Sequence, residues 1–201
     1  MRLNLFLILL FISILGCSKN RGNQIIIDRD FENLSIIDKW VEGKEIVFLG
    51  EPTHGDGSIF TARIKIIVWL ASAHALENPY SIVDPEDLKE IGQTYADMVT
   101  LGKFAKSHFG DKMLNLAFSA YQGSFYDFVD KKEIDFRLDS IPNLERNTIE
   151  KNMAITLVDL RKIDSVYYSG ILGFEFIQAN WGKNFDGVFI FPEVKASRRI
   201  E

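Results

Sequence analysis

Short, unbroken apolar runs separated by polar stretches are the feature of this sequence that most restricts its fold. Ile46–Leu49 is one such run. Similar, mostly apolar runs span residues 64–70, where Lys65 is the only charge, and residues 113–120, 154–160 and 187–191. Runs of this length without polar alternation are typical of strands buried on both faces of a sheet. Helical patterns at 85–109, ending at a glycine, and at 144–152 alternate with these runs. We therefore predict an α/β fold with a mainly parallel sheet flanked by helices.

The first 16 residues have the layout of a secretory signal, in which a positive charge precedes a short apolar run that ends at Gly16. Cys17, the only cysteine of the 201 residues, follows directly. The sequence Ile-Leu-Gly-Cys at 14–17 resembles the lipobox of bacterial lipoproteins, although Leu15 stands where a small residue is usual. The alternative is an ordinary signal peptide with an incidental cysteine. Lipidation accounts better for a lone exported thiol that has no disulfide partner.

We accordingly expect three parts along the chain: a signal peptide at 1–16, a tether at 17–27 that begins with a lipidated Cys17, and one α/β domain at 28–201. Ser18 follows the cysteine, and no aspartate stands there to suggest retention in the inner membrane, so we expect an anchor in the outer membrane. The formal net charge is -5, without a basic run, which argues against a nucleic-acid partner.

Two polar side chains follow the first apolar run on a tight turn. Glu51 and His54 lie three residues apart between Gly50 and Gly55. If the turn leads into a helix, both side chains share a face, and Glu51 could orient His54 as a general base. Alternatively, Glu51 is a helix cap and His54 is a partly exposed turn residue. A Glu-x-x-His pair can also bind a metal ion, but only one such pair is present.

The other candidate residues follow later in the chain. His74 comes just after the apolar run at 64–70, so we predict that it approaches His54 across the ends of adjacent strands. The simpler interpretation is a hydrogen-bonded histidine at the edge of the core. We interpret His108, near a helix end, as structural. Arg63 is a solvated or capping charge unless the sheet brings it over the turn.

These residues carry a resemblance to a known family. The segment Ile46–Leu49 followed by Gly50-Glu51-Pro52-Thr53-His54-Gly55 resembles the first signature of the erythromycin esterase family. Residues 65–69 with His74 are similar to the second signature, and weaker similarity continues to about residue 191. The resemblance implies hydrolysis of a small-molecule ester without a metal or other cofactor. It implies that His54 activates water, that Glu51 and His74 share its pocket, and that Arg63 offsets charge on an oxyanion.

Two departures from the family pattern change what the resemblance implies. Ala71 stands where the family often has another histidine, and the long segment between the two signatures is missing near residues 63–64. The expected domain is thus an incomplete version of the erythromycin esterase-like domain, with little or no macrolide esterase activity. Two other functions stay open: a non-catalytic, degenerate lipoprotein with a binding role or none, and a periplasmic protein that binds metal or haem.

Overall fold

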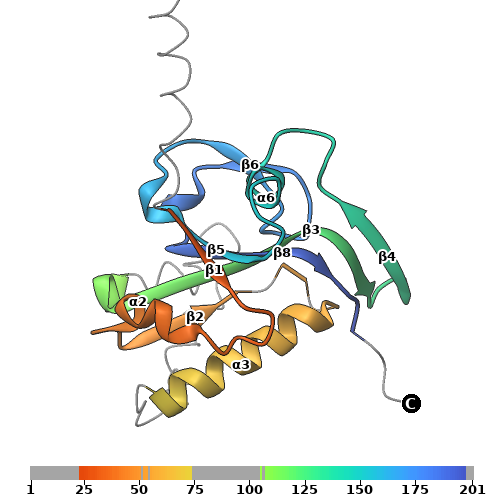
Figure 1. Cartoon of the computed structure of the whole chain (residues 1–201). Coiled ribbons are helices and arrows are strands. Elements are labelled where there is room, and N and C mark those ends of the chain that lie inside the picture. The colour runs from red at the N-terminus through yellow and green to blue at the C-terminus, as the bar shows by residue number, and fades with distance from the viewer. Residues whose placement is uncertain (1–22, 51, 54, 74–104, 106, 198–201) are drawn as a thin grey trace, which may run out of the picture.

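The fold is built on a mixed six-stranded sheet. The computed structural model describes residues 23–50, 52–53, 55–73, 105 and 107–197. The strands run in the order β1-β5-β8-β3-β2, and β4 pairs with β3 outside this path (Figure 1). Their bounds are β1 Gln24–Ile27, β2 Ile46–Leu49, β3 Met113–Asp127, β4 Lys132–Arg137, β5 Ile155–Asp159 and β8 Gly187–Val194. The α/β class expected from the sequence is confirmed.

The expected mainly parallel arrangement is not confirmed, because the sheet contains both kinds of pairing. β3 is parallel to β2 and to β8, whereas β1–β5, β5–β8 and β3–β4 are antiparallel. The parallel strands β2, β3 and β8 form one continuous block. Their carboxyl ends therefore lie at one edge of that block, which is where sites form in sheets of this kind.

Two layers cover the sheet. The helix α3, Gly57–Ala73, packs on one face, whereas α6, Leu144–Ile149, and the hairpin of β6, Tyr167–Ser169, and β7, Ile177–Ala179, lie over the other (Figure 1). The central strand β3 serves both layers, because Phe118 contributes to the α3 core and Ala117 to the α6 core. The remaining elements are η3 Leu34–Ile37, α2 Asp38–Val41, η5 Gly110–Lys112, η6 Leu160–Lys162 and η7 Trp181–Lys183.

The predicted strand at residues 64–70 is wrong, because this segment belongs to α3. The reason is the spacing of the residues that the helix buries against the sheet: Ile59, Ala62, Ile66 and Leu70. They recur at intervals of three and four, which places them on one helical face. Packing of that face outweighs the preference of the Ile-Ile-Val sequence at 66–68 for a strand.

An interruption in one edge of β3 is the feature that positions the candidate site. Leu116 pairs with both β2 and β8, and Gln122 pairs with both β4 and β8. Since a strand has only two edges, β2 and β4 share the edge opposite β8. Between them, residues 117–121 of β3 pair with neither strand. We call this interruption the β3 notch.

Most of the predicted helix at 85–109 lies outside the described residues. Its last turn is described: residues 107–109 are helical, and Gly110 has a φ of 53° in the left-handed region. No helix in the described part of the chain is long and apolar enough to cross a membrane.

Candidate functional site

The turn after β2 begins beside Leu116, at one end of the β3 notch, and ends against Tyr126, beyond the other end. The amide of Gly50 donates to Leu116 O at 2.9 Å, so the turn begins as a continuation of β2. In the middle, Pro52 O accepts from the amide of Gly173 at 3.0 Å. Backbone hydrogen bonds to other segments therefore hold the turn at Gly50 and at Pro52, and they also hold its last residue, Gly55.

The end of this turn requires a glycine. Gly55 O accepts from the amides of Tyr126 at 3.0 Å and Ser197 at 2.8 Å. A Cβ atom at residue 55 would lie 1.8 Å from Tyr126 O, which is not compatible with any side chain. The Gly-x-x-x-x-Gly frame of the sequence thus has a structural reason: its last glycine lets the turn pass directly against β3.

Asp56 is a buried carboxyl group at the start of α3, two residues after His54. Its Oδ1 accepts from the amide of Ile59 at 2.9 Å, as a helix N-cap does. Its Oδ2 is buried and has no hydrogen-bond partner in the described structure. Burial raises the pKa of this carboxyl from 3.8 to about 6, although hydrogen bonds from backbone amides act in the opposite direction. The group therefore titrates close to neutral pH.

Arg63 lies on α3, one and a half turns into the helix. It is four residues after Ile59 and three before Ile66, and both of these side chains are buried. Residues at these spacings lie on the same side of a helix, so Arg63 is at the flank of the face that packs on the sheet. Its Nε atom is buried accordingly. The structure thus places Arg63 beside the core and on the helix that follows the turn.

The other predicted site residues, Glu51, His54 and His74, lie outside the described residues, as does Cys17. One premise about them is corrected. His74 follows a helix and not a strand, and the described neighbours Gly55 and Ala73 lie at opposite ends of α3. At about 1.5 Å per residue, a helix of 17 residues is roughly 25 Å long. The argument that adjacent parallel strands bring His54 and His74 together therefore no longer holds.

A second buried carboxylate, Glu145, was not predicted. It belongs to α6, on the sheet face opposite α3, and its Oε1 accepts three hydrogen bonds. The donors are Ser119 Oγ at 2.7 Å, Ser169 Oγ at 2.5 Å and the amide of Gly170 at 2.9 Å. Burial raises the pKa of Glu145 above its ordinary value, although the hydrogen bonds from these donors act in the opposite direction. Glu145 joins α6 to β3 and β6, which is a structural function.

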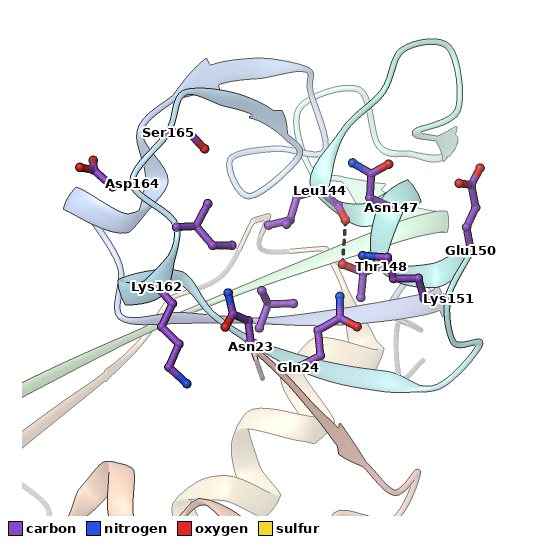
Figure 2. Close-up of a pocket in the computed structure, with 12 residues that line it drawn as sticks. Asn23, Gln24, Leu144, Asn147, Thr148, Glu150, Lys151, Lys162, Asp164 and Ser165 are labelled. Atoms are coloured by element: carbon purple, nitrogen blue, oxygen red, sulfur yellow. Dashed lines mark hydrogen bonds between the residues drawn. The ribbon is translucent and has the colours of Figure 1, made fainter. Parts of the chain in front are cut away.

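A hollow of about 450 Å³ lies on the α6 side of the molecule, between α6 and the first described residues (Figure 2). Its charged residues balance one another: Lys151 and Lys162 against Glu150 and Asp164. Figure 2 shows Asp164 and Glu150 on opposite sides of the hollow. Arg63, the described residue of the predicted site, is not among its lining residues. Elsewhere among the described residues, no three His, Cys, Asp or Glu side chains form a group that could hold a metal ion.

No known protein-family profile and no curated protein matches the chain. Among solved structures, a protein from Bacillus cereus aligns with 50% of this chain and 29% of its own, at a TM-score of 0.40 and 17% identity. A succinoglycan biosynthesis protein aligns with 48% of this chain and 28% of its own, at a TM-score of 0.39 and 16% identity. The chain thus spans less than a third of each of these two structures.

Proposed function

We propose that this protein is an ester hydrolase whose site is the turn after β2, with His54 as the base that activates water. The observation that carries the proposal is the anchoring of this turn at Gly50, Pro52 and Gly55. A general base contributes only when it is held within reach of the reacting water, so a rigid turn at the carboxyl end of a parallel strand is a suitable support. Asp56, with its raised pKa, adds a titratable group next to that turn.

The proposed reaction uses few groups. His54 takes a proton from water, and the resulting hydroxide attacks the carbonyl carbon of the ester. Negative charge develops on the carbonyl oxygen, and the guanidinium of Arg63 offsets it. When the tetrahedral intermediate collapses, the C–O bond to the alcohol breaks and protonated His54 returns the proton to the leaving oxygen. Glu51 orients the imidazole of His54 in this scheme. His74 has no assigned function, since it follows the far end of α3.

The proposed substrate is a small ester and not a macrolide. A macrolide needs a deep cleft with walls that hold it and exclude water. α3 follows the turn almost directly, and its outward side chains Phe60, Ile64, Ile67 and Val68 are 44–60% exposed. No further layer therefore covers this side of α3 in the described structure. A small aryl ester needs much less surrounding surface to reach a base on the turn.

The test is hydrolysis of 4-nitrophenyl acetate by the purified protein and two matched histidine variants. A histidine base contributes roughly 10²–10⁴-fold, so His54→Ala should lower kcat/KM at least about tenfold once background hydrolysis is subtracted. His108→Ala is the control, because His108 is exposed and its ring packs edge-on against that of Phe109, with 4.8 Å between the ring centroids. If both variants hydrolyse the ester as fast as the parent, the turn after β2 is not the site, and a non-catalytic function is favoured.

A further inference from the structure

A second hollow, of about 630 Å³, lies between the first turns of α3 and the carboxyl end of β8. We call it the α3–β8 hollow. Ser58, Thr61 and Lys65 line it from α3, and the end of β8 and the residue after it contribute Phe191, Pro192, Glu193 and Lys195. The two walls are joined directly, because the amide of Lys195 donates to Ser58 Oγ at 2.9 Å. The orange, N-terminal end of α3 lies beside the segment where the chain leaves β8 (Figure 1).

The charges around the α3–β8 hollow are mostly positive. Arg29, Lys65 and Lys195 line it, and among the described lining residues Glu193 is the one acidic side chain. This excess is notable in a protein with a net charge of -5. Lys65 is held in place, since its Nζ donates to Asp30 O at 3.1 Å and lies 3.7 Å from Asp30 Oδ1. Asp30 offsets the charge of Lys65, so Arg29 and Lys195, from two separate segments, supply the excess of positive charge that favours an anionic ligand.

Two of these cations are available to a ligand. The side chains of Arg29 and Lys195 are exposed and make no hydrogen bond or ion pair with the described residues. An anion that binds between them would not need to break an existing ion pair. The bound anion would, however, lie near the carboxylate of Glu193, and repulsion between the two negative charges weakens binding.

The floor of the α3–β8 hollow is apolar. Phe31, Ile155 and Phe191 are each at most 8% exposed and present carbon atoms to the hollow. Met153 also lines it, and its side chain is 68% exposed, which is unusual for a large apolar residue. A flexible thioether side chain adapts to ligands of irregular shape. A hydrocarbon group that covered Met153 would remove this exposed apolar surface from water.

We propose that the α3–β8 hollow binds a small anionic amphiphile, a molecule with a carboxylate head and a hydrocarbon body. The carboxylate lies between Arg29, Lys65 and Lys195, and the hydrocarbon body lies along Met153 and the apolar floor. Pockets of 300–1,000 Å³ are about the size that encloses a ligand of this kind. The proposal does not depend on ester hydrolysis, because the residues that carry it, Arg29, Lys195 and Met153, have no function in the proposed reaction.

The test is a calorimetric titration of the purified protein with decanoate below its aggregation concentration, compared with acetate and 1-decanol. We expect decanoate to bind more tightly than either control compound, because each of them has only half of the required chemistry. Arg29→Gln and Lys195→Gln should each weaken decanoate binding by about threefold or more, and Glu193→Gln should strengthen it. Met153→Glu should abolish it. Lys183→Gln, a change at an exposed lysine on η7, is the matched control and should have no effect.

Thermal unfolding of each variant separates loss of the ligand site from loss of the fold. The proposal fails if decanol binds as tightly as decanoate, or if folded Arg29→Gln and Lys195→Gln bind decanoate like the parent. Binding to anionic vesicles with no binding of free decanoate would also contradict it, and would indicate a lipid surface as the partner. Loss of esterase activity in His54→Ala with decanoate binding intact would show that the two sites are separate.

Discussion

The carboxyl group of Asp56 couples the candidate site to the stability of the fold. Its pKa is raised from 3.8 to about 6 by burial, so the folded state prefers the protonated form. The stability that this preference gives is complete below about pH 3.8 and is lost as the pH rises through about 6. Asp56→Asn keeps an oxygen for the amide of Ile59 but carries no charge at any pH. We expect the variant to be about 2–3 kcal/mol more stable than the parent above pH 7, and equal to it near pH 3.5.

Urea unfolding of both proteins at several pH values measures this difference. Asp135→Asn, which removes a carboxyl group at an exposed position on β4, is the matched control. A constant difference between parent and Asp56→Asn from pH 3.5 to 8 would mean that Asp56 does not titrate as its burial requires.

Glu145 provides a second test of a buried carboxylate, this time of its hydrogen bonds. Glu145→Ala leaves three donors without an acceptor in a buried place, which should lower the free energy of unfolding by about 2–4 kcal/mol. Glu145→Gln keeps an acceptor oxygen at nearly the same position and should cost about 1 kcal/mol or less. Chemical denaturation at neutral pH checks both values. Equal losses for Ala and Gln would show that the charge, and not the acceptor, holds α6 on the sheet.

The sequence motif indicated the turn, but it did not indicate the buried carboxyl groups. Asp56 is a recognisable N-cap only when residues 57–73 are interpreted as a helix, and the Ile-Ile-Val sequence inside that helix favoured a strand instead. For Glu145, a signal was present in Ser119, the one hydroxyl within the buried apolar run at 113–120. A buried hydroxyl needs a partner. Which residue supplies it depends on contacts between distant segments, here α6 and β3.

At the scale of elements, strands were predictable where an apolar run indicates a buried strand and no other element. The apolar runs at Ile46–Leu49, 113–120, 154–160 and 187–191 all form strands in the structure. β4, Lys132–Arg137, was missed because it pairs with a single strand, carries charged residues and has little buried surface. Such a strand is specified by its pairing with β3, which a pattern of buried residues cannot reveal.

The helix α3 can be distinguished from the strand that its sequence suggests by two substitutions. In a strand, residues 66 and 68 would share a face, whereas in the helix Ile66 is 1% exposed and Val68 is 60% exposed. Ile66→Ala should therefore lower the free energy of unfolding by about 2–5 kcal/mol. Val68→Ala should leave it unchanged or raise it by about 0.5 kcal/mol, because alanine has the higher helix propensity. Comparable large losses for both variants, in the same denaturation experiment, would support a buried strand.

At the scale of the whole molecule, the sequence predicts that the domain is attached to a membrane by its first mature residue. If Cys17 carries lipid, Cys17→Ser should leave an uncleaved precursor or release soluble protein. Fractionation of cells that express each form, followed by mass spectrometry of the N-terminus, checks this. A Cys17→Ser protein that is processed and remains in the membrane fraction like the parent would rule out the lipid anchor.

The class of the fold was predictable at this scale, but the pairing of its strands was not. Apolar runs indicate that strands are buried, yet β5 and β8 pair antiparallel and β3 and β8 pair parallel, although the apolar runs of all three are largely buried. Whether two neighbouring strands run parallel or antiparallel depends on the path that the connecting segments take across the faces of the sheet. The connection between α3 and β3 falls mostly in residues 74–104, outside the described part of the chain.

We propose that this domain carries a working base, His54, but lacks the surroundings that a macrolide requires. The most direct test compares initial rates on erythromycin and on 4-nitrophenyl acetate, for the purified protein without its lipid and for His54→Ala. We predict that the parent exceeds His54→Ala at least about tenfold on the aryl ester, while the two are indistinguishable on erythromycin. Robust turnover of erythromycin that disappears in His54→Ala would contradict this account, because it would show that the shortened domain is a complete macrolide esterase.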